Sequence, residues 1–391
     1  MACAKMQKAS DHFRLFLRRL LPRNVIVPGI VLISSSLCLA GQKTDRTKES
    51  PDNPWSGSFE TQLGYESNVN EVNRYVEPVT SSWYSESALE LTHSVQRGSG
   101  SYVLTLQAEY KTFFSSGALD EFLLQPGVLW QGDFSDDVLL EVNCHAGFFR
   151  AKVQQAFVNE PNETEEGVGA GAGFEFEKNC PDHTVLKWGG RIEGELFEYQ
   201  QGSNLGCNAN LEAERLLGND ITVRAGVTWE WQAYRKMRWS GQPNDEPPEL
   251  NTMGGRAFAG FSGSWSKNWK WEMSLIGGPD FDLERGYYNA LTVGLRSKLI
   301  YQVGNWTLSL RVDPQTAIFS NRPAVLVGSS PPLAVQELWA GTEVVYAISP
   351  GWELFGGAAL NCQWTNGGNS PDASLNSFDD FVVRSGLRVK F

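Results

Sequence analysis

Three histidines follow the basic amino-terminal stretch of the chain: His93, His145 and His183. They are the first candidates for catalysis, which needs a nucleophile within hydrogen-bond reach of a base. His93 falls on the apolar face of its predicted strand, and His183 falls in a predicted turn. His145 lies on a polar face beside Asn143, without the Ser, His and Asp spacing that is typical of a triad. We therefore predict that the protein is not an enzyme.

Four cysteines lie in the same part of the chain: Cys144, Cys180, Cys207 and Cys362. None of them forms a CxxC pair, so we expect neither a metal nor another cofactor. Cys144, Cys207 and Cys362 fall on apolar faces, where a cysteine usually behaves as a small hydrophobic residue. Disulfide bonds remain an open alternative, because an oxidising compartment would permit them.

Charged residues occupy the polar face of the predicted strands, and their sign changes along the chain. Carboxylates dominate this face in the first half: Glu60, Glu86, Glu90, Glu109, Glu141, Glu193, Glu195 and Glu212. Cations are enriched on it in the second half: Arg224, Arg256, Arg296, Lys298, Arg311, Arg384 and Arg388. If the strands form one closed wall, these sets become an acidic wall and a basic wall around a lumen. Two interpretations stay open, a transverse field that orients ions and solutes or ion-pair networks that stiffen the wall.

The alternation behind this pattern continues through almost the whole chain from residue 57 onward. Leu104 and Leu106, for example, alternate with Thr105 and Gln107. A period of two residues is typical of a β-strand. The segments with this period are 57–66, 83–95, 101–114, 121–131, 138–151, 167–177, 185–199, 204–216, 221–234, 256–265, 270–278, 288–301, 306–314, 335–348, 352–364 and 380–391. They predict an all-β chain of about sixteen strands, with fourteen to eighteen also compatible.

The connections between these segments alternate between short, as at 302–305, and long, as at 235–255. Both ends of the strand array lie on the short-turn side. Aromatic residues gather at strand ends on both sides, with Trp306 on the short-turn side and Tyr65 and Tyr84 on the other. Short turns, long outer loops and two aromatic girdles are expected of an outer-membrane barrel. We predict a single transmembrane antiparallel up-and-down β-barrel.

The composition agrees with this class. The chain has 391 residues and a net charge of −12, which argues against nucleic-acid binding. Its mean hydropathy of −0.30 and the lack of a run of ~20 apolar residues after residue 40 argue against a helical membrane protein.

The amino end has the features of an export signal. Basic residues precede an apolar core at residues 25–33, and small residues precede Gly41. We expect a Sec-type signal peptide at 1–40, a flexible periplasmic leader at 41–56 and the barrel at 57–391. A membrane anchor helix is the alternative for the first segment, but Pro28-Gly29 interrupts its apolar core.

The carboxyl-terminal strand has one nearly uniform apolar face, formed by Phe381, Val383, Ser385, Leu387, Val389 and Phe391. It resembles the terminal targeting strand of bacterial outer-membrane β-barrels, which typically ends in Phe. The resemblance implies that Phe381, Val383, Leu387, Val389 and Phe391 form an assembly signal read by the barrel-assembly machinery. It also implies that this strand closes the barrel against the first one.

A second resemblance covers six residues within Leu63–Asn70. The run is similar to the Gly-Tyr-Asp-Ser-Asn-Val motif of the beta-barrel porin 2 group, with Glu66 in place of Asp. That group is associated with exopolysaccharide operons. The resemblance implies an alternative role in polysaccharide export or envelope assembly without general conductance.

Our leading expectation is a porin-like outer-membrane channel for passive diffusion of small hydrophilic solutes or ions. Its partners would be outer-membrane lipid, lipopolysaccharide and the permeating solutes or polysaccharide, with a homotrimer as one conceivable assembly. General porins fold a long third outer loop inward as a constriction. The corresponding connection here, 153–166, is short and carries Glu160, Glu163, Glu165 and Glu166, so the lumen is either wide or filled by other side chains.

Overall fold

The described part of the chain consists almost entirely of strands. The computed structural model describes residues 54–67, 81–97, 100–114, 120–135, 137–153, 163–197, 203–218, 220–234, 250–283, 289–323, 331–366 and 378–391. The predicted signal peptide, the leader up to residue 53 and the longest outer connection lie outside the described residues. Within those ranges, no helix is long and apolar enough to cross a membrane.

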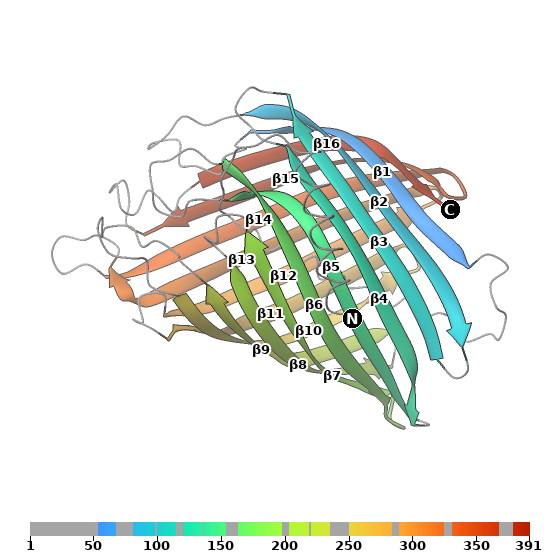
Figure 1. Ribbon diagram of the computed structural model, residues 1–391, viewed down its shortest axis with the longest axis horizontal. Coiled ribbons are helices and arrows are strands. Elements are labelled where there is room, and N and C mark those ends of the chain that lie inside the picture. The colour runs from blue at the N-terminus through green and yellow to red at the C-terminus, as the bar shows by residue number, and fades with distance from the viewer. Residues whose placement is uncertain are drawn as a thin grey trace, which may run out of the picture.

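Sixteen antiparallel strands close into one barrel, in which each strand pairs with its neighbours in sequence and β1 pairs with β16 (Figure 1). The strands are β1 (Trp55–Glu66), β2 (Ser82–Arg97), β3 (Gly100–Phe113), β4 (Glu121–Ser135), β5 (Val138–Val153), β6 (Glu163–Asn179), β7 (Thr184–Phe197), β8 (Asn204–Leu217), β9 (Ile221–Tyr234), β10 (Leu250–Ser266), β11 (Trp269–Asp282), β12 (Ala290–Val303), β13 (Trp306–Pro323), β14 (Pro332–Ser349), β15 (Trp352–Thr365) and β16 (Phe378–Lys390). The predicted strand number and topology are confirmed.

The two rims differ in the length of their connections, as predicted. Every second connection, beginning with the one after β2, has two to four residues, and the others have six to fifteen. We call these edges the short-turn rim and the long-loop rim. Tight turns on the former use left-handed backbone, for instance at Gly351 with a φ of 82°. The carbonyl of Gly351 also accepts a hydrogen bond from the amide of Lys390 at 2.7 Å. A Cβ at this position would lie 2.5 Å from the carbonyl oxygen of Lys390 on β16.

Some strands extend beyond their predicted limits on the long-loop rim. β13 continues to Pro323 instead of residue 314, and β10 begins at Leu250 instead of residue 256. β6 begins at Glu163, so Glu163, Glu165 and Glu166 belong to a strand rather than to the third outer connection. These ends lack clear alternation, but their backbone groups pair with the neighbouring strands. Cross-strand pairing therefore overrides the local sequence pattern.

The two faces of the barrel wall are distinguished by contacts that skip a strand. Lys111 on β3 reaches Glu66 on β1 at 2.8 Å, passing the Tyr84 ring on β2 at 4.4 Å. Side chains converge in this way on the concave face of a closed sheet. The residues that alternate with them are apolar and exposed on the convex face, including Leu63 (56%) and Leu104 (46%).

Inward aromatic side chains lie over glycines of the adjacent strand. Phe258 on β10 faces Gly226 on β9, and a Cβ added there would lie 2.7 Å from the ring. Tyr84 packs in the same way over Gly64 and is only 2% exposed. Tyr84 therefore faces the interior, which corrects its predicted place in the aromatic girdle of the long-loop rim. Because these rings lie along the wall, they narrow the lumen less than upright rings would.

Gly386 offers a test of this packing at the seam between β1 and β16. A Cβ at this position would overlap the carbonyl oxygen of Thr61 and lie 2.6 Å from the Phe355 ring. We expect Gly386→Val to destabilise the closed barrel by ~2 kcal/mol or more, because a crowded wall must shift its backbone. Gly356→Val is the matched control, since a Cβ at Gly356 would have its nearest neighbour 3.7 Å away. Denaturant unfolding of both variants measures the difference, and equal midpoints would contradict the packing argument.

Candidate functional site: the inner wall of the barrel

The strand register places all eight carboxylates of the predicted acidic wall on the concave face. Cross-strand pairs connect them to one another and to other inward residues, for example Gln62 with Glu86 and Gln131 with Glu141. The same alternation places Glu90, Glu109, Glu193, Glu195, Glu212 and Glu60 on this face. Sequence alternation was sufficient to find them, because a strand exposes every second residue to the same side.

Four of the eight acidic-wall carboxylates accept hydrogen bonds from neutral amides. Glu86 accepts one from Gln62 at 2.8 Å, Glu109 from Gln107 at 2.6 Å and Glu141 from Gln131 at 2.7 Å. Glu195 accepts one from Asn204 at 3.0 Å. A neutral donor orients a carboxylate without cancelling its charge. These side chains therefore keep negative charge at fixed places on the wall.

Among the described residues, four cations lie beside the eight carboxylates of the acidic wall: Lys111 opposite Glu86, Lys187 opposite Glu212, and Arg191 and Arg388. Glu60 contacts Arg388 at 2.7 Å and Glu193 contacts Arg191 at 3.1 Å. Glu90 and Glu212 have no hydrogen-bond or ion-pair partner among the described residues. Near the short-turn rim, Glu141 lies directly opposite Glu175 on β6. The β1–β8 side of the interior therefore carries an excess of negative charge.

The basic wall has a different arrangement, because most of its cations contact carboxylates of the same side. The ion pairs are Arg224–Glu272 at 4.0 Å, Arg256–Asp280 at 2.6 Å, Arg311–Asp313, Arg384–Glu343 at 3.2 Å and Arg388–Glu353 at 3.4 Å. In the described part of the chain, Arg296 and Lys298 have no such partner. The structure thus shows local pairing on β9–β16 together with unpaired carboxylates on β1–β8.

The seam between β16 and β1 brings few opposite charges together among the described residues. Arg388 bridges it by contacting Glu60 on β1. Lys390 pairs instead with Glu353 on β15 at 2.6 Å. Arg384 pairs with Glu343 on β14 at 3.2 Å. Glu66, at the long-loop end of β1, contacts Lys111 on β3 at 2.8 Å. The reason is register, because Glu66 lies opposite the apolar Val382 of β16.

Backbone hydrogen bonds hold the last residue of the chain at this seam. The amide of Gly57 donates to the carbonyl of Phe391 at 2.8 Å, and the amide of Phe391 donates to the carbonyl of Gly57 at 3.0 Å. At the other end of β16, the amide of Ser67 donates to the carbonyl of Phe381 at 3.0 Å, and the amide of Phe381 donates to the side-chain hydroxyl of Ser67 at 2.7 Å. The Phe391 side chain is 59% exposed on the convex face. The terminal residue therefore continues the hydrogen bonding of the seam by one residue beyond the end of β16.

The surroundings of His145 and of the four cysteines differ from those of catalytic or metal-binding residues. Both imidazole nitrogens of His145 lie near Arg191, at 3.2 and 3.3 Å, rather than beside a hydroxyl or thiol. Cys144, Cys180, Cys207 and Cys362 are free thiols. In the ranges that the structure describes, no group of three or more His, Cys, Asp or Glu could hold a metal ion.

The inward cations that were absent from the predicted walls include Lys111, Lys187, Arg191 and Lys270. Their positions follow from the same alternation, which would have identified them. Lys111 lies beneath the long-loop rim, with its nitrogen 4.4 Å from the Tyr84 ring and 4.7 Å from the Phe113 ring. Lys270 lies at the opposite end, on the second residue of β11.

A closed barrel with sixteen strands, short turns at one rim and a polar interior decides the structural class. The chain has the fold of outer-membrane porins. OccAB1 of Acinetobacter baumannii has this fold with a TM-score of 0.50 and 8% identity, covering 86% of this chain and 97% of that one. The porin fold here is thus reached with a very different sequence.

Two further solved structures align over the same extent. A BenF-like porin from Pseudomonas fluorescens Pf-5 has a TM-score of 0.48 and 9% identity, over 86% of this chain and 98% of that one. OpdK of Pseudomonas aeruginosa, solved with vanillate, has a TM-score of 0.46 and 10% identity, over 86% and 99%. No protein-family model and no curated protein matches the chain.

Proposed function

We propose that the protein is an outer-membrane channel through which small hydrophilic solutes diffuse passively, with a preference for cations. A barrel of sixteen strands encloses an aqueous passage rather than a core filled by side chains. The observation that carries the proposal is the excess of unpaired carboxylates on the inner face of β1–β8. Fixed negative charge in a narrow, water-filled passage concentrates cations and repels anions.

The convex face supports the membrane location. It presents apolar side chains, and aromatic pairs lie at its edges, such as Trp306–Tyr346 at 4.6 Å and Tyr65–Trp83 at 5.5 Å. Trp and Tyr favour the boundary between hydrocarbon and water. The predicted signal peptide and the assembly signal on β16 would supply export and recognition by the barrel-assembly machinery.

Reconstitution in planar lipid bilayers tests the channel directly. We expect stable single-channel currents and, under a KCl gradient, a reversal potential of the sign given by K⁺ permeation. The preference should weaken in ~1 M salt, where charges are screened within about 3 Å. A pore that selects anions would contradict the role of the acidic wall, and a folded barrel without conductance would contradict the channel itself.

One observation favours a second candidate, in which the barrel serves an envelope polysaccharide. Among the described tryptophans, only Trp339 faces the interior, where it lies opposite Asp313 and Asn361. An aromatic ring beside hydrogen-bonding side chains suits the apolar and polar faces of a sugar. The Arg311 guanidinium lies 5.1 Å from the ring centre and covers part of this surface. Absence of conductance together with oligosaccharide binding that Trp339→Ala abolishes would favour this candidate.

A further inference from the structure

Three inward cations on β11 and β12 differ from the other cations of this half of the barrel. Lys270, Arg296 and Lys298 contact no carboxylate among the described residues, whereas Arg224, Arg256, Arg311, Arg384, Arg388 and Lys390 all do. The three side chains are exposed to the interior. Unpaired positive charge is therefore concentrated in one place rather than spread over the wall.

Register places the three cations in successive inward rows that lead from the short-turn rim into the barrel. Lys270 lies opposite Ile300, Lys298 opposite Glu272, and Arg296 opposite Ser274. We call these three residues the basic cluster. Since consecutive inward residues of a strand are ~7 Å apart, one ligand with two charged groups spans two rows.

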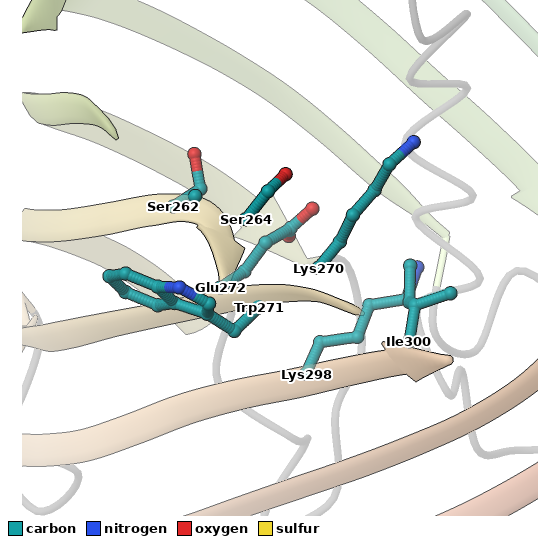
Figure 2. A pocket seen from close by; sticks show the side chains of 8 residues that line it. Ser262, Ser264, Lys270, Trp271, Glu272, Lys298 and Ile300 are labelled. Carbon is teal, nitrogen blue, oxygen red and sulfur yellow. The ribbon is translucent and has the colours of Figure 1, made fainter. Parts of the chain in front are cut away.

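A pocket lies at the end of the basic cluster that is nearer the short-turn rim. It has a volume of ≈ 200 Å³ and is lined by Ser262, Gly263, Ser264, Lys270, Trp271, Glu272, Lys298 and Ile300. Figure 2 shows Lys270, Glu272, Ser262 and Ser264 on one side of the sheet and Trp271 directed away from them. Ammonium groups and serine hydroxyls are donors that suit the oxygen atoms of an anion.

The only carboxylate that lines this pocket does not cancel the cluster. Glu272 pairs with Arg224 on β9 at 4.0 Å, across Gly260 of β10. Lys298 also lies opposite Arg311, whose charge is neutralised by Asp313. The local balance is therefore positive, in contrast to the acidic wall of β1–β8.

We propose that the basic cluster is a binding site for a small polyvalent oxyanion, such as a phosphate ester or a dicarboxylate, at the short-turn mouth of the lumen. The proposal rests on the open, water-filled interior of the proposed function. One oxyanion group would contact Lys270 and the pocket serines, and the second would contact Lys298 or Arg296. The site would hold an anionic solute at the mouth of a passage whose opposite wall favours cations.

Direct binding to the detergent-solubilised, folded barrel tests the site without requiring conductance. Isothermal titration with pyrophosphate should show saturable binding that weakens as salt is raised. In the K270Q/K298Q double variant, the affinity should fall about tenfold or more, because two charge-assisted contacts are lost. Titration with succinate shows whether two carboxylates replace two phosphoryl groups.

Arg215→Gln is the matched control. Arg215 also carries a positive charge near the short-turn rim, but it pairs with Asp182 at 3.4 Å outside the lumen. Pyrophosphate affinity should change less than about twofold in this variant, since its charge is exposed to solvent. Wild-type protein that binds no pyrophosphate, or a K270Q/K298Q variant that binds it as tightly, would overturn the proposal.

A second measurement separates this proposal from the channel function. In bilayers, pyrophosphate added on the short-turn side should reduce the current of the wild type and not that of K270Q/K298Q. Normal current without block would overturn the anion site and leave the channel intact. A silent barrel that binds pyrophosphate through the two lysines would overturn the channel and retain the site.

Discussion

Deletion of Phe391 is expected to prevent most of the protein from reaching its stable, closed form. The truncated chain loses both backbone hydrogen bonds to Gly57, at 2.8 and 3.0 Å, and the ring at the end of the convex face. Each backbone hydrogen bond contributes about 1 kcal/mol net, and unpaired groups in a membrane cost more. Since a barrel is stable only when no edge remains, a weakened seam affects every strand. We expect at least a fivefold loss of folded protein, measured by heat-dependent mobility in gels of purified outer membranes.

Phe391→Ala separates the backbone contribution from that of the side chain. This variant keeps the two backbone hydrogen bonds with Gly57 and loses only the aromatic ring. The difference in folded protein between Phe391→Ala and the deletion therefore measures the contribution of these backbone hydrogen bonds. If the ring serves as the recognition element, Phe391→Ala should also assemble slowly, whereas Phe391→Tyr should assemble normally. Full assembly of the deletion variant would show that closure does not depend on the terminal residue.

Charge reversal of the acidic wall is expected to remove most of the cation preference. Glu109→Lys together with Glu141→Lys changes the interior charge by four units at two carboxylates whose hydrogen-bond donors, in the described part of the chain, are amides. Both residues face the lumen on the β1–β8 side, where carboxylates outnumber cations. The cation-to-anion permeability ratio should therefore fall roughly fivefold or more at ~0.1 M salt, where the Debye length is about 10 Å. Reversal potentials in planar bilayers measure this change.

Two controls show whether the effect depends on position and on sign. The Glu109→Gln and Glu141→Gln pair removes charge without adding it, so its ratio should lie between those of the wild type and the reversed variant. Asp182→Lys reverses one charge, a change of two units, in an exposed short turn where the carboxylate pairs with Arg215 outside the lumen. It should leave the selectivity nearly unchanged. Unaltered selectivity in the charge-reversed double variant would show that the acidic wall does not determine which ions permeate.

The alternation of residues is sufficient to predict most of this architecture, and particular strands show why. Along β3, Leu104 and Leu106 alternate with Thr105 and Gln107, so the strand, its two faces and the inward position of Glu109 all follow from a period of two. The prediction was less complete at β13, where residues 315–323 lack alternation. Pairing with β12 and β14 extends the strand there, since backbone groups without partners are costly.

Which charges meet is decided only by tertiary structure. The sequence predicted an inward Glu60 and an inward Arg388, but it did not indicate that these two would contact each other or that Glu66 would contact Lys111. A side chain's face depends on its own strand, whereas its partners depend on the register and shear of strands far apart in the sequence. The same relation explains the basic cluster. Lys270, Arg296 and Lys298 point inward because of local alternation, whereas the register of β9, β10 and β11 decides that Glu272 contacts Arg224.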